Sequence, residues 1–107
     1  MRIRHGEHIV IGPGKVALLE AIRACGSISA AARDLGMSYR RAWLLLDELN
    51  RSLATPAAVS GHGGHNRGGC TLTPVGERIV DLYRTIEDKA AASTQAEIAS
   101  LMALISA

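Results

Sequence analysis

Residues 26–50 read GSISAAARDLGMSYRRAWLLLDELN, and this stretch decides the fold. Two short helical patterns lie on either side of Gly36, the residue type that most readily adopts the left-handed conformation in which helices end. Ser29 is the predicted N-cap of the first helix and Ser38 that of the second. The alanines at positions 30–32 let two helices approach closely, as a helix-turn-helix requires.

The second helix, from residue 39 to about residue 50, has an apolar face and a polar face. Its predicted inward stripe follows the spacing i, i+3, i+4, i+7 and consists of Ala42, Leu45, Leu46 and Leu49. The predicted outward face consists of Arg40, Leu44, Asp47 and Arg51, with Tyr39 and Arg41 at its flanks. Leu44 lies where a solvated helix would carry a polar residue. It either contacts a thymine methyl group or indicates that the helix is rotated from this assignment.

These features predict binding to double-stranded DNA. In a helix-turn-helix the first turn of the second helix enters the major groove, where arginine binds guanine or phosphate. The residues expected to contact DNA from this unit are Ser29, Ser38, Tyr39, Arg40, Arg41 and Arg51. A solvated charged face on a small helical bundle is the alternative.

Composition and charge agree with a DNA-binding domain of modest size. The chain has 107 residues, 48% of them hydrophobic and 3% aromatic, so one domain with a core of Leu, Ile, Val and Ala is expected. Residues 1–73 carry 9 Lys/Arg and 5 Asp/Glu, whereas residues 74–107 carry 3 Lys/Arg and 5 Asp/Glu. A basic body suits a polyanion, and the weakly acidic tail suits another partner. The sequence contains no membrane-length apolar run and no signal-peptide pattern, so a cytoplasmic protein is expected.

The N-terminal residues lead into the helix-turn-helix. Residues 1–11 predict either two short strands or one strand after an irregular segment. The apolar spacing over residues 15–25 predicts a supporting helix, on whose apolar face Cys25 is expected to be a small core residue. Cys25 and Cys70 lack paired spacing, and a structural disulfide is not expected in the cytoplasm.

A glycine-rich loop between two short strands follows the helix-turn-helix. Residues 57–60 form a weak strand pattern, residues 61–69 read GHGGHNRGG, and residues 70–72 resume the strand. Thr73 and Pro74 then fit the N-cap and first residue of a helix. This layout is that of a winged helix with residues 61–69 as the wing; a flexible linker is the alternative. The wing residues expected to contact the DNA backbone or minor groove are His62, His65, Asn66 and Arg67.

The same loop permits a second interpretation. His62, His65 and Cys70 are residue types that bind metal ions. A fourth ligand is not evident, and ordering a flexible loop costs conformational entropy. We therefore expect phosphate contacts and no cofactor, with a metal-responsive regulator as the alternative.

The tail carries a long apolar stripe at helical spacing. Residues 74–92 form one helical pattern, and residues 94–97 fit a capping box, so either one helix bends near Ser93 or a second begins there. The stripe exceeds what the small body needs and indicates a homodimer interface; a tail folded back on its own body is the alternative. The predicted dimerisation residues are Ile79, Leu82, Tyr83, Ile86, Ile98, Leu101, Met102 and Ile105.

The sequence therefore predicts a mainly α fold with a small β-sheet. Residues 1–73 would form a winged helix-turn-helix DNA-binding domain, and residues 74–107 a helical dimerisation element. An enzyme is not expected, because the sequence has no carboxylate pair, Ser/His/Asp set or P-loop. A protein-interaction module on the same scaffold is the alternative from another functional class.

Several segments together form a recognisable pattern: GPGKVALLEAI at 12–22, GSISAAARDLGMSYRRAW at 26–43, DELN at 47–50, the glycine-rich wing, and LTPVGERIVDLY at 72–83. The chain resembles the DNA-binding domain of the ModE-type molybdate-responsive regulators, a winged helix of the same broad kind as that of LysR-type regulators. The resemblance implies a homodimeric transcriptional regulator whose helix 38–50 enters the major groove. It implies that Ser38, Tyr39, Arg40 and Arg41 read the DNA. The C-terminal molybdate-binding domains of that family have no counterpart in these residues, so molybdate sensing is not implied and the effector is left open.

Overall fold

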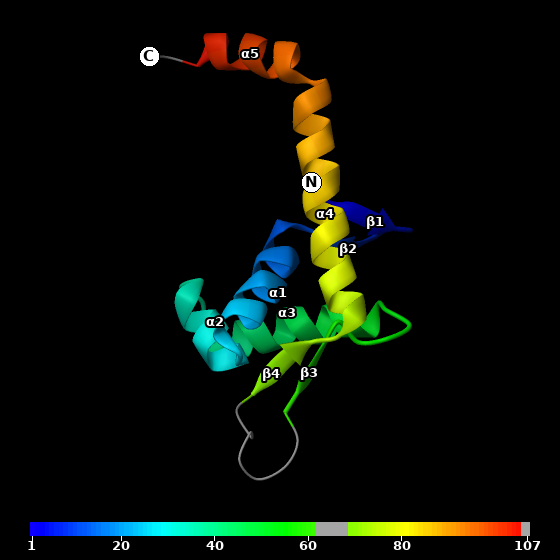
Figure 1. Ribbon diagram of the computed structural model, residues 1–107, viewed down its shortest axis with the longest axis vertical. Coiled ribbons are helices and arrows are strands. Elements are labelled where there is room, and N and C mark those ends of the chain that lie inside the picture. The colour runs from blue at the N-terminus through cyan, green and yellow to red at the C-terminus, as the bar shows by residue number, and fades with distance from the viewer. Residues whose placement is uncertain (62–68, 106–107) are drawn as a thin grey trace.

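The computed structural model describes residues 1–61 and 69–105. Its strands form two separate antiparallel pairs, β1–β2 and β3–β4, and its helices make up most of the chain (Figure 1). The elements in order are β1 (Ile3–His5), β2 (His8–Ile11), α1 (Pro13–Cys25), α2 (Ile28–Asp34), α3 (Tyr39–Arg51), β3 (Ala58–Ser60), β4 (Cys70–Leu72), α4 (Pro74–Ser93) and α5 (Gln95–Leu104). The mainly α fold, the N-terminal pair of strands and the two strands that flank the wing loop are confirmed.

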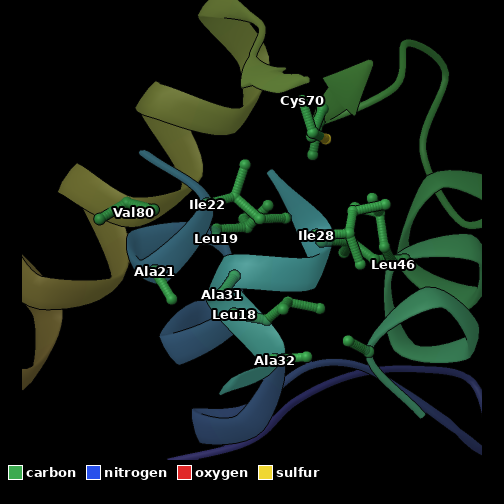
Figure 2. Close-up of a cluster of buried hydrophobic side chains, with 14 residues drawn as sticks. Leu18, Leu19, Ala21, Ile22, Ile28, Ala31, Ala32, Leu46, Cys70 and Val80 are labelled. Carbon is green, nitrogen blue, oxygen red and sulfur yellow. The ribbon is translucent and has the colours of Figure 1, made fainter. Parts of the chain in front are cut away.

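Helices α1, α2 and α3 pack around one hydrophobic core. Leu19 and Ile22 from α1 lie beside Ile28 from α2 and Leu46 from α3 (Figure 2). Burial of a Leu or Ile side chain stabilises the fold by roughly 1.5–3 kcal/mol relative to exposure. The inward stripe predicted for α3 is confirmed, since Ala42, Leu46 and Leu49 are buried and Leu45 is half-buried.

The junction between α1 and α2 differs from the prediction at two residues. Ser27, and not Ser29, is the N-cap of α2, because its Oγ accepts a hydrogen bond from the Ala30 N–H at 3.0 Å. Cys25, predicted to be a core residue, is exposed. It is the last residue of α1, and Gly26 with φ of 80° turns the chain away immediately after it. The core contacts of α1 therefore end one turn earlier, at Ile22.

The start of α4 lies directly against the segment that leads into β3. The Thr73 Oγ1 caps α4 by accepting from the Gly76 N–H at 3.1 Å, and it donates to the Pro56 carbonyl at 2.6 Å. The Thr73 N–H donates to the Ala57 carbonyl at 2.9 Å. A Cβ on Gly76 would lie 2.0 Å from that Ala57 oxygen, so only glycine permits this approach.

Helix α4 divides the predicted apolar stripe between two faces. Val80 and Tyr83 are each 2% exposed and belong to the core of their own chain. The Tyr83 hydroxyl donates to the Met1 carbonyl at 2.6 Å, so this side chain, predicted to contact a second copy, faces inward. Leu82 and Ile86 are 45% and 44% exposed on the adjoining face. The inward positions of α4 thus follow Gly76, Val80 and Tyr83, a stripe that is rotated from the predicted one.

Ion pairs join α1 to α4. The Arg84 guanidinium contacts both carboxylate oxygens of Glu20, with Nε at 3.0 Å from Oε2, and its Nη1 lies 2.6 Å from Glu87 Oε1. The hydrogen bonds from Arg84 hold the pKa of the Glu20 carboxyl below its ordinary value. Arg23 makes a second link to Glu77 at 3.2 Å. These pairs add to the buried contacts of Val80 and Tyr83 that hold α4 against the body.

The last two helices extend away from the body. Helix α4 runs out from the helices α1–α3 and α5 turns off at its far end (Figure 1). The radius of gyration is 16.3 Å, against about 13 Å for a compact chain of this length. The capping box predicted at residues 94–97 is wrong: the Thr94 side chain does not cap α5, and its Oγ1 donates to the Ala90 carbonyl at 2.6 Å. A separate helix nevertheless begins at Gln95. None of the helices in the described ranges is long and apolar enough to cross a membrane.

Candidate nucleic-acid interface

A tight turn joins α2 to α3. Gly36 has φ of 68°, and the Met37 N–H donates to the Ala32 carbonyl at 2.9 Å. The Met37 side chain packs partly buried against the core. The Ser38 Oγ accepts from the Arg41 N–H at 3.1 Å, which confirms the predicted cap of α3. The turn and the cap together fix where the first turn of α3 points.

The first turn of α3 is open to solvent. Tyr39 is 54% exposed and Leu44 is 43% exposed, and both arginines between them are exposed. Arg40 and Arg41 form no ion pair in the part of the chain that the structure describes. Two guanidinium groups are thus available for a phosphate or a guanine base. The exposure of Leu44 also shows that α3 is not rotated from the sequence assignment.

The C-terminal half of α3 has a different electrostatic character. Arg51 Nε lies 2.9 Å from Asp47 Oδ2, one turn earlier on the same face. Glu48 lies 3.6 Å from the Lys15 ammonium of α1. Positive charge without a nearby carboxylate is therefore concentrated on the first turn of α3. Arg51, predicted as a DNA contact, already has a carboxylate partner with which phosphate would compete.

The strands β3 and β4 bring the ends of the wing loop together beside α3. Their register pairs Ser60 with Cys70, and the Gly61 N–H donates to the Gly69 carbonyl at 2.6 Å. The expected contact residue Ser29 is exposed on α2. The predicted wing contacts at His62, His65, Asn66 and Arg67 lie outside the described residues.

Cys70 is the third candidate metal ligand, beside two loop histidines that lie outside the described residues. Its side chain is 2% exposed and points into the core near Ile22 (Figure 2). Burial in these apolar surroundings raises the pKa of the Cys70 thiol, which disfavours the thiolate that a metal ion binds. Within residues 1–61 and 69–105, no three His, Cys, Asp or Glu side chains are grouped so that they could hold a metal ion.

Trp43 belongs to this surface although the sequence reasoning did not select it. The side chain is 46% exposed and lines a groove of about 340 Å³ between α3 and β3, together with Pro56 and Val59. The sequence pattern that could have identified Trp43 is its position four residues after Tyr39. This spacing places both aromatic side chains on the same flank of the helix. At Trp43 this flank faces β3.

Comparison with known proteins assigns the family. The family described as "Bacterial regulatory helix-turn-helix protein, lysR family" matches residues 14–77. The chain belongs to the LysR family of bacterial regulatory helix-turn-helix proteins. This LysR-family chain is 47% identical over 77 residues to the molybdenum-pterin-binding protein MopB of Rhodobacter capsulatus, covering 72% of the chain and 28% of MopB. It is 37% identical over 87 residues to the transcriptional regulator ModE of Haemophilus influenzae, covering 81% of the chain and 34% of that regulator.

The LysR-family chain thus spans about a third or less of the length of these curated relatives. Their names confirm the resemblance to ModE-type regulators, and they are named as regulatory or binding proteins rather than enzymes. Among solved structures, the CbnR_DBD–DNA complex has a TM-score of 0.64, covering 85% of this chain and 99% of that chain. At 21% identity this likeness concerns the fold, which is that of a helix-turn-helix domain with a wing.

Proposed function

We propose that the protein is a sequence-specific transcriptional regulator that binds double-stranded DNA as a homodimer. The observation that carries this proposal is the exposed first turn of α3, where Arg40 and Arg41 stand on a helix-turn-helix scaffold without a carboxylate partner among the described residues. In this proposal α3 enters the major groove. The loop of residues 61–69 contacts the backbone or the minor groove beside it.

The arrangement of charge supports this orientation. The acidic side chains of α3, Asp47 and Glu48, lie further along the helix and are paired with Arg51 and Lys15. Phosphate therefore meets uncompensated positive charge only at the N-terminal end of the helix. Helix α3 also begins there, so its N-terminal partial positive charge adds to that of the arginines.

Selection of duplexes from a random library, followed by binding measurements, tests the proposal. Arg40→Ala and Arg41→Ala should each weaken binding to the selected duplex by about 1–3 kcal/mol if a base contact is lost. Lys89→Ala is the matched control, because it removes an exposed positive charge near the far end of α4. If both arginine variants bind as wild type does, α3 is not the reading helix.

The salt dependence separates this function from a protein-interaction module. A surface that neutralises phosphates releases counterions, so the logarithm of the affinity for duplex falls linearly with the logarithm of the salt concentration. We expect a steep slope for wild type and a shallower one for Arg41→Ala. No measurable duplex binding at low salt would favour the interaction module instead.

The proposed dimer rests on an apolar surface that the described part of the chain leaves open. Leu82 and Ile86 border an apolar groove of about 200 Å³ whose other wall includes Ile3 and Ile11 of the N-terminal strands. None of the described α5 residues is buried, and Leu101 is 63% exposed. The exposed apolar side chains beyond the body are Leu82, Ile86, Ile98, Leu101, Met102, Leu104 and Ile105. Exposed apolar side chains gathered on one part of a protein mark an interaction site, and a second copy would cover them.

Sedimentation of a charge-substituted variant tests the dimer. Wild type should sediment as a dimer at micromolar concentration, whereas Ile86→Glu combined with Leu101→Glu should sediment as a folded monomer, because unpaired charges resist burial. Thr85→Glu is the control, since it adds a charge beside Ile86 but away from the apolar groove. A monomeric wild type would refute the dimer.

A further inference from the structure

Leu44 is an exposed apolar side chain beside the positively charged first turn of α3. It is 43% exposed and lies one helical turn after Arg40 on the outward face of α3. The opposite face is fixed, because Ala42, Leu46 and Leu49 are buried in the core. Leu44 therefore cannot turn inward without removing those residues from the core.

The neighbouring charges indicate what covers Leu44. The turn before it holds Arg40 and Arg41 without carboxylate partners in the described chain. The carboxylates of Asp47 and Glu48 on the turn after it are already paired with Arg51 and Lys15, so the uncompensated charge beside Leu44 is positive and favours a negatively charged partner. The apolar surface assigned above to a second copy of the chain lies elsewhere, on α4 and α5. Among the base edges of the DNA major groove, the apolar group is the C5-methyl of thymine.

We propose that Leu44 is a specificity-determining residue that packs on the C5-methyl group of a thymine in the operator. This inference rests on the proposed DNA-binding function. An α-helix rises about 1.5 Å per residue and base pairs are spaced by about 3.4 Å, so four residues along α3 correspond to about two base pairs. The thymine should therefore lie within about two base pairs of the position that Arg40 contacts.

Replacement of thymine by deoxyuracil in the selected duplex tests this contact, because it removes the methyl group and keeps the base-pairing edge. In wild type, binding should be sensitive to this replacement at one thymine in each half-site. Its replacement should weaken binding about fourfold per half-site, as expected for one buried methyl-sized group. Leu44→Ala should bind the thymine and deoxyuracil duplexes equally at that position, and Leu44→Met should retain the discrimination.

The coupling between residue 44 and the methyl group is measured by the full double-mutant cycle. Leu44→Ala alone also weakens binding if it disturbs α3, but only a methyl contact makes its effect depend on the methyl group. If wild type binds the selected duplex specifically and no thymine shows this dependence, the inference is refuted while the proposed function stands. If wild type selects no duplex, both are refuted.

Discussion

The substitution Gly76→Ala tests whether stability requires the close contact between the start of α4 and the backbone before β3. In the structure a Cβ at this position would lie 2.0 Å from the Ala57 carbonyl oxygen and 2.9 Å from its carbon. Both are backbone atoms that cannot rotate aside, so the start of α4 has to move away. That movement lengthens the 2.9 Å hydrogen bond from the Thr73 N–H to the same oxygen.

The cost follows from these contacts. Overpacking of a filled site costs about 1–3 kcal/mol, and each hydrogen bond that is lost at Thr73 adds about 1 kcal/mol. Alanine recovers up to about 1 kcal/mol through its higher helix propensity. We therefore expect the free energy of unfolding to fall by about 3 kcal/mol. That is a large fraction of the 5–15 kcal/mol typical of a folded domain.

Urea denaturation followed by the helical circular dichroism signal measures this change, at one fixed protein concentration because dimerisation would add to stability. Gly14→Ala is the matched control. It is also a helical glycine, but a Cβ there meets nothing within 4 Å, so it should be neutral or stabilise by up to about 1 kcal/mol. A Gly76→Ala protein within about 0.5 kcal/mol of wild type would contradict the packing argument, since surface substitutions without such a clash fall in that range.

Two further predictions concern a helix cap and an ion pair. Ser27→Ala should lower the free energy of unfolding by about 1 kcal/mol, because Ser27 caps α2, whereas Ser29→Ala should change it by less than about 0.5 kcal/mol; equal effects would contradict the assigned cap. Arg84→Ala should lower it by up to about 1 kcal/mol at pH 7. Arg84 lowers the pKa of Glu20 below 4.5, so this contribution is complete above that pH and is lost as the pH falls through the lowered pKa. The difference in the free energy of unfolding between wild type and Arg84→Ala, measured by urea denaturation, should therefore become smaller in acid. A difference that does not change with pH would refute the assignment to Glu20.

The helix-turn-helix could be predicted from the sequence because its signals are local. The apolar spacing of α3, the left-handed turn at Gly36 and the cap at Ser38 each depend on residues within one or two turns of each other. The paired strands around the glycine-rich loop and the cap of α4 at Thr73 are local in the same sense. The exposure of Arg40 and Arg41 on the first turn of α3 followed from the same short-range pattern.

Other features depended on segments that are distant in the chain. Tyr83 and Leu82 are neighbours with similar apolar character, yet contact with α1 and the N-terminus buries one and leaves the other exposed. Helix α2 begins at Ile28, whose side chain is buried in the core, so Ser27 and not Ser29 is placed to cap it. Periodicity identifies an apolar stripe on a helix but not the partner that each part of the stripe meets.

Thus the sequence by itself determined the helix-turn-helix and its outward arginines, since short-range spacing and turn chemistry specify them. Tertiary structure decided where α4 leaves the body, because Gly76 must lie against the Ala57 backbone and Arg84 must reach Glu20. Those contacts join residues that lie far apart in the sequence, and no local pattern encodes the distance between them. They also decided which apolar side chains of α4 remain exposed.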